Sequence, residues 1–145
     1  MRSRNPLSLS AKMARAVLAS TFIASGGSAL AMDAAKMLTG SEEVPAVSTA
    51  ATARSAIVVD SDFTVRGSIE TSGIDATAAH IHHGAKGVSG PPVVTLVRTG
   101  PTTWSVPEGS KFTQSQYEDY KSGNFYVNVH SLAHPAGEIR MQLAP

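Results

Sequence analysis

Residues 79–84 read AHIHHG, and residues 125–130 read FYVNVH. The side chains of a β-strand alternate between the two faces of a sheet, so residues two apart share a face. In the second segment Phe125, Val127 and Val129 therefore lie together on an apolar face, which is predicted to be buried. The opposite face carries polar side chains. We predict that both segments are strands of one sheet, with the core on one side and a polar surface on the other.

Histidines are concentrated on this predicted polar face. The chain has five, of which His80 and His82 share one face of the first strand and His130 lies on the polar face of the second. Neutral imidazole is a good ligand for copper, zinc and nickel. We therefore expect a Cu or Zn site, with one ring nitrogen of each of these three histidines within about 5 Å of a common point. That geometry requires the strands to be adjacent or one strand apart, with Ile81 buried on the reverse face.

Four further polar side chains are assigned to a network around the histidines. Tyr126 and Asn128 share a face with His130. Asn128 is placed to fix an imidazole tautomer, and Tyr126 is a candidate fourth ligand. Glu138 and Arg140 lie on the last predicted strand, and an ion pair between them on the same polar face fits an interpretation without metal. A second interpretation stays open, in which the histidines bind no metal and brace the sheet through hydrogen bonds.

The rest of the chain is predicted to form short strands and one helix. Alternating apolar residues predict a hairpin with strands over 52–60 and 63–70. Thr113 and Gln116 form the capping-box pattern of a helix that ends before Gly123. Further strands are expected over 37–40, 93–97, 104–106 and 138–143. Many short strands separated by turn residues predict an all-β fold, a Greek-key β-sandwich or small barrel with one short helix near 113–122.

The first 31 residues have the pattern of a secretory signal peptide. A basic start is followed by an apolar run over 16–31, which ends in the A-x-A cleavage pattern at 29–31. The run is short and rich in glycine and serine for a membrane span. We expect a signal peptide at 1–31 and one domain at 32–145, periplasmic or secreted, with no membrane span after cleavage. An uncleaved anchor is the alternative.

Charge and cysteine usage exclude several classes of function. Residues 32–145 contain eight Lys and Arg against eleven Asp and Glu, a formal charge of −3, so no nucleic-acid partner is expected. The chain has no cysteine, which excludes disulfides, zinc–thiolate and iron–sulfur sites and a Cys nucleophile. No serine lies in a nucleophile motif, so an enzyme is not the expected class. His83 and His134 are placed in or beside loops, outside the site.

Four sequence blocks resemble the signature of the CHRD domain family. They are EVP at 43–45, HIHxGxxGxxG at 80–90, YVNVH at 126–130 and PxGEIRxQ at 135–142. They follow the family's order and cover nearly all of 32–145. The resemblance implies an all-β domain outside the cytoplasm and, by analogy with chordin, a module that binds an extracytoplasmic protein. The metal ion is the other expected partner, and it rests on the histidines alone. It does not imply a defined enzymatic activity.

The histidine pattern is also similar to the copper site of Cu,Zn superoxide dismutases. In that family a His-x-His pair on a strand of a Greek-key barrel binds copper on the outer face, as the pair His80 and His82 would here. The zinc loop and the structural disulfide of that family are missing. This likeness implies a copper redox enzyme as a third alternative, with Arg140 as the cation that attracts the substrate anion.

Overall fold

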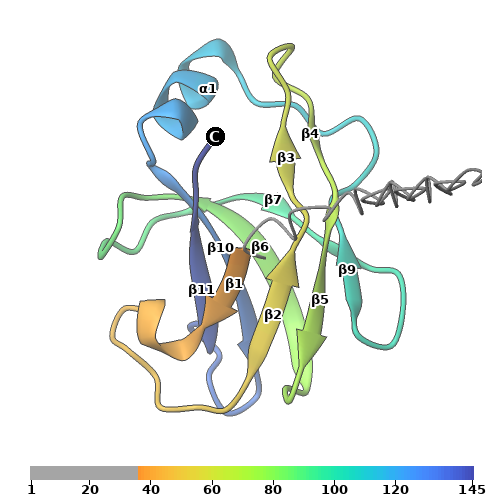
Figure 1. Cartoon of the computed structure of the whole chain (residues 1–145), viewed down its shortest axis with the longest axis vertical. Helices are drawn as coiled ribbons and strands as arrows, with labels where there is room; N and C mark the ends of the chain where they lie inside the picture. Colours follow the sequence, from red (N-terminus) through yellow and green to blue (C-terminus); the bar gives the residue numbers. More distant parts are fainter. Residues whose placement is uncertain (1–35) are drawn as a thin grey trace, which may run out of the picture.

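The computed structural model describes residues 36–145, which form a curled antiparallel sheet of nine strands (Figure 1). The strand order is β7-β6-β10-β11-β1-β2-β5-β9-β8, and the sheet is nearly closed into a barrel. The prediction of an all-β fold with one short helix is confirmed, in its small-barrel form. The predicted signal peptide at 1–31 lies outside the described residues.

The strands and helices follow one another in two halves. The first half contains β1 (Lys36–Thr39), the 3-10 helix η1 (Gly40–Glu42), β2 (Thr52–Ser55), β3 (Val58–Val59), β4 (Val65–Arg66) and β5 (Ser68–Ser72). The second half contains β6 (Ala76–His83), β7 (Pro92–Thr95), β8 (Val97–Arg98), β9 (Thr103–Ser105), α1 (Gln114–Lys121), β10 (Phe125–Ser131) and β11 (Ile139–Leu143).

One segment, 92–98, lies at both ends of the sheet. Its first part, β7, pairs with β6, and its second part, β8, pairs with β9. Between them Leu96 is buried, and its backbone N–H donates to the Ala79 carbonyl at 2.9 Å. The single strand predicted over 93–97 is therefore bent at Leu96 into two short strands. This bend is what brings the two ends of the sheet together.

The predicted hairpin over 52–70 is confirmed but interrupted. β2 pairs with β5, while β3 and β4 form a separate two-stranded ribbon. The ribbon diverges at Ala56, whose N–H bonds to the Ser68 carbonyl at 2.9 Å, and at Gly67, which has φ of 111°. A positive φ is accessible to glycine without a steric penalty, so the chain changes direction there.

Helix α1 begins and ends where the capping pattern predicts. The Thr113 hydroxyl accepts from the Gln116 N–H at 3.2 Å, and the Gln116 side chain accepts from the Thr113 N–H at 2.8 Å. Gly123, with φ of 77°, follows its C-terminus. Tyr120 packs beside Phe112 and anchors the helix to the core. Within residues 36–145, no helix has both the length and the apolar character needed to cross a membrane.

The core occupies the inside of the barrel, on the face that alternation predicts. Ile81, Val127 and Val129 are fully buried, as predicted. Trp104 also joins the core cluster. The reverse side of β6 and β10 is the outer wall of the barrel, and the predicted site residues lie on this wall.

Candidate metal centre

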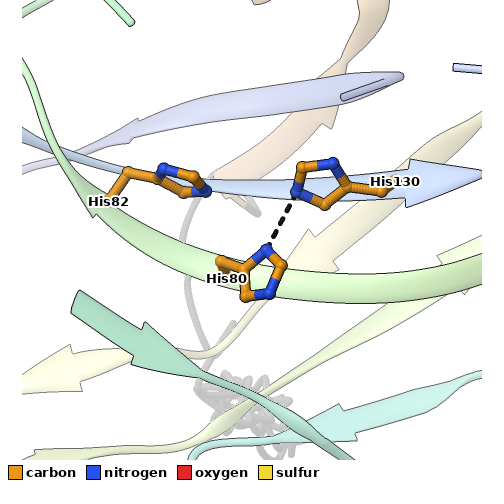
Figure 2. A group of neighbouring side chains, drawn as sticks. All are labelled: His80, His82 and His130. Carbon is orange, nitrogen blue, oxygen red and sulfur yellow. Dashed lines mark hydrogen bonds between the residues drawn. The ribbon is translucent and has the colours of Figure 1, made fainter. Parts of the chain in front are cut away.

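The three predicted ligands converge on the outer wall from two adjacent strands (Figure 2). β6 and β10 are antiparallel neighbours, with Asn128 opposite His80 and Ala78 opposite His130. His130 thus lies diagonally across from His80, and the ring nitrogens Nδ1 of His80 and Nε2 of His130 are 3.0 Å apart. One ring nitrogen from each of the three histidines lies within 4.8 Å of the other two. The predicted strand adjacency and the predicted convergence are both confirmed.

Two backbone carbonyls determine where the imidazole protons lie. His82 Nδ1 is 2.8 Å from the Gly90 carbonyl, and His130 Nδ1 is 2.9 Å from the Pro135 carbonyl. A carbonyl oxygen only accepts, so each Nδ1 carries the proton and each neutral ring keeps a lone pair on Nε2. Metal-ligating histidines are usually held in this way, with the other ring nitrogen bonded to a carbonyl or carboxylate.

Three buried acceptor atoms near the cluster have no hydrogen-bond donor among the described residues. They are His82 Nε2, Asn128 Oδ1 and Glu43 Oε1. A buried polar atom without a partner costs about 1–3 kcal/mol, so native structures rarely keep several together. Of the three, only His82 Nε2 belongs to the group of converging ring nitrogens, and its free lone pair is what binding a cation requires. The three histidines therefore fit a metal ion.

Burial keeps two of the histidines in the form that binds metal. Removal from water lowers the pKa of His82, and the bond to the Gly90 carbonyl offsets this only in part. Burial also lowers the pKa of His80, with further lowering by the neighbouring His130 and His82 rings. A lowered pKa favours neutral imidazole, whose lone pair is free to coordinate.

Acidification is expected to destabilise the metal-free protein below about pH 6.5. The unfolded chain gains protons on His80 and His82 near that value, whereas the folded state resists protonation, so the free energy of unfolding falls as the pH drops. Urea unfolding at pH 7.5 and pH 5.5 measures the difference. A His80→Gln/His82→Gln variant should show a smaller difference between the two pH values. Equal pH dependence in both proteins would contradict the assignment.

Tyr126 packs directly against the site. Its ring is parallel to the His82 ring, with centroids 4.8 Å apart and an interplanar angle of 8°. Its hydroxyl accepts from the Gly90 N–H at 3.0 Å. The oxygen predicted as a candidate fourth ligand is therefore hydrogen-bonded to Gly90. On the Tyr126 ring the Arg140 guanidinium carbon lies 3.4 Å from the centroid. Arg140, Tyr126 and His82 thus form one continuous stack.

The predicted ion pair between Glu138 and Arg140 is wrong. Arg140 is 2% exposed, and its Nη2 donates to the carbonyls of Ala85 and Val88, both at 3.0 Å. Glu138 instead accepts from the hydroxyls of Thr49, at 2.7 Å, and of Ser131. Loop 84–91 covers Arg140, so this cation is also not available to attract an anion from solvent.

The two remaining histidines lie outside the cluster, as predicted. His83 Nε2 is 3.2 Å from a carboxylate oxygen of Asp119 in α1, and the His83 ring stacks on Phe125. His134 lies in the turn after β10, where it lines a pocket of about 200 Å³ with Pro135 and neighbouring residues. Neither contributes to the group of converging nitrogens.

Glu43 and the backbone groups that orient the rings are not among the site residues predicted from the sequence. Glu43 is 8% exposed although glutamate is rarely buried, so residue type alone places it at the surface. The carbonyls of Gly90 and Pro135 carry no side-chain signal. The only available clue was that Glu43, Gly90 and Pro135 all fall within the four blocks of the CHRD signature.

Comparison with known proteins identifies the family. The family model of the CHRD domain matches residues 35–143, which is most of the chain and includes all the site residues described above. No curated protein and no solved structure matches the chain. The match agrees with the order of the four sequence blocks. This protein belongs to the CHRD domain family.

Proposed function

We propose that this protein is an extracytoplasmic binding module that holds a copper or zinc ion with His80, His82 and His130. The observation that carries the proposal is the buried Nε2 of His82, which has a lone pair aimed into the cluster and no hydrogen-bond partner among residues 36–145. The signal-peptide pattern at 1–31 supports a location in the periplasm or outside the cell.

The spacing of the rings suits one ion after a small adjustment. Zinc–nitrogen bonds are about 2.0–2.1 Å long, so the ligand atoms of a tetrahedral site are roughly 3.4 Å apart. The candidate nitrogens lie within 4.8 Å of one another. Rotations of the imidazole rings that move each nitrogen by about an ångström would bring them to the distances of a tetrahedral site. His80 now donates its Nδ1 proton to the His130 Nε2 lone pair, so a bound ion replaces this hydrogen bond. An all-imidazole ligand set suits Cu and Zn.

Replacing the three histidines is expected to abolish tight binding of Cu(II) and Zn(II). The test is isothermal titration of the protein beside a His80→Ala/His82→Ala/His130→Ala variant. A His83→Ala/His134→Ala variant is the matched control, because it removes imidazoles outside the cluster and should bind as the unmodified protein does. Equal binding by the unmodified protein and the triple variant, or binding by neither, would reject the metal site.

A second candidate function is a structural or protein-interaction domain without metal. The observation that favours it is that the same rings tie together β6, β10 and two loops, through the bonds to Gly90 and Pro135 and between His80 and His130. In that case the triple variant loses stability, and protein purified from its native compartment contains no metal. Stoichiometric copper or zinc in such a preparation would rule this candidate out.

A further inference from the structure

A buried carboxylate lies behind the histidine cluster. Glu43 is 8% exposed, and among residues 36–145 its Oε2 accepts from the Val44 N–H at 3.4 Å, while its buried Oε1 has no hydrogen-bond donor. Burial raises the pKa of Glu43, and the Val44 N–H, the Asn128 amide and the Arg140 charge offset this only in part. A carboxylate kept in such a place needs a cation or a donor to balance it.

The Asn128 side chain separates Glu43 from His82. A Cβ added to Gly137 would lie 2.5 Å from Glu43 Oε1 and 2.7 Å from Asn128 Nδ2. Both side-chain atoms therefore pack against Gly137. The Asn128 amino group therefore faces the carboxylate. The Asn128 Oδ1 is buried without a donor among the described residues, and Asn128 lies opposite His80 in the pairing of β10 with β6. The Glu43 carboxylate, the Asn128 amide and the His82 imidazole therefore form a series that leads to the metal centre.

We infer that Glu43 is a positioning residue that gives the histidine site its preference for divalent over monovalent ions. The inference rests on the proposed function. Three neutral imidazoles bring no charge, and the buried Arg140 guanidinium nearby opposes a cation. A negative charge at Glu43 stabilises the ion in proportion to the ion's charge, and it holds the Asn128 oxygen toward the ligands. Two charges roughly 8–10 Å apart inside a protein change an affinity about ten-fold for each unit of ion charge.

The experiment compares Zn(II) with Cu(I), two closed-shell ions that differ in charge. Affinities of the full-chain protein are measured by competition with chromophoric chelators, under anaerobic conditions for Cu(I). Glu43→Gln, which keeps the shape and removes the charge, is expected to lower the Zn(II) affinity about ten-fold more than the Cu(I) affinity. Glu42→Gln is the matched control, because Glu42 is partly exposed and paired with Lys86, so its charge is screened by solvent.

Moving the charge provides the second arm of the test. Asn128→Asp is expected to raise the Zn(II) affinity relative to Cu(I), and the double variant Glu43→Gln/Asn128→Asp is expected to recover the ratio of the unmodified protein. A purely structural role for Glu43 would change both affinities equally, and the inference is then wrong while the metal site stands. Failure of the unmodified protein to bind either ion overturns both the proposed function and this inference.

Discussion

Replacing Gly90 by alanine is expected to destabilise the domain by roughly 3 kcal/mol or more and to weaken metal binding. A Cβ at this position would lie 1.7 Å from the His83 carbonyl oxygen and 2.8 Å from its carbon. Both are backbone atoms of β6, so neither can move away cheaply. Relief of the clash requires loop 84–91 to lift, which breaks the bonds of Gly90 to His82 and Tyr126.

Urea unfolding monitored by circular dichroism and isothermal titration with Zn(II) measure the two effects. Gly87→Ala is the matched control within the same loop, since a Cβ there meets nothing within 4 Å. Gly87 has φ of 77°, so alanine should cost about 1 kcal/mol of backbone strain and leave metal binding unchanged. If the two variants lose similar stability, the bonds of Gly90 to His82 and Tyr126 do not hold loop 84–91 against the site.

Replacing Arg140 by leucine is expected to destabilise the domain by about 3–5 kcal/mol. The substitution removes the donors that satisfy the carbonyls of Ala85 and Val88, and it removes the guanidinium that covers the Tyr126 ring. It also removes the positive charge of Arg140, which favours the ionised form of the buried Glu43 carboxylate. Thermal or urea unfolding at neutral pH gives the change in free energy.

Two further variants separate the role of Arg140 from a general effect of charge. Arg140→Lys keeps the charge but lacks the planar group that donates to two carbonyls while stacking on a ring, so an intermediate loss is expected. Arg66→Ala removes an exposed arginine paired with Asp60 at 2.6 Å and should change the free energy of unfolding little, because solvent screens this pair. A loss for Arg140→Leu as small as that for Arg66→Ala would show that the buried stack contributes little.

Alternation along two strands was enough to predict the histidine cluster. A β-strand repeats every two residues, so the faces of His80, His82 and His130 follow from their positions once one face is known to be buried. The apolar residues Val127 and Val129 supplied that knowledge. The helix was predictable for a similar reason, because a capping box is a local pattern that requires no tertiary contact.

The surroundings of the site could not be predicted in the same way. Alternation gives the face on which a side chain lies, but not what later covers that face. Arg140 lies on the outer wall as expected, yet the backbone of loop 84–91 folds over it and supplies its acceptors. Glu43 is buried because Asn128 and Gly137 pack against it from distant parts of the chain. The bend at Leu96 likewise depends on pairing with β6 and β9, which local sequence does not encode.

The bend at Leu96 also limits how another protein can attach to this domain. Because 92–98 pairs at one end with β6 and at the other with β9, the sheet built by residues 36–145 keeps only short edges that none of these residues pairs, along the four residues of β7 and the two of β8. Pro92 removes one backbone donor from the first of these. Peptides that bind by strand addition need a longer free edge, and so do the cross-strand contacts that lead to aggregation. A protein partner is therefore expected to recognise side chains and loops of the described domain. The loops that hold the histidine rings belong to this surface.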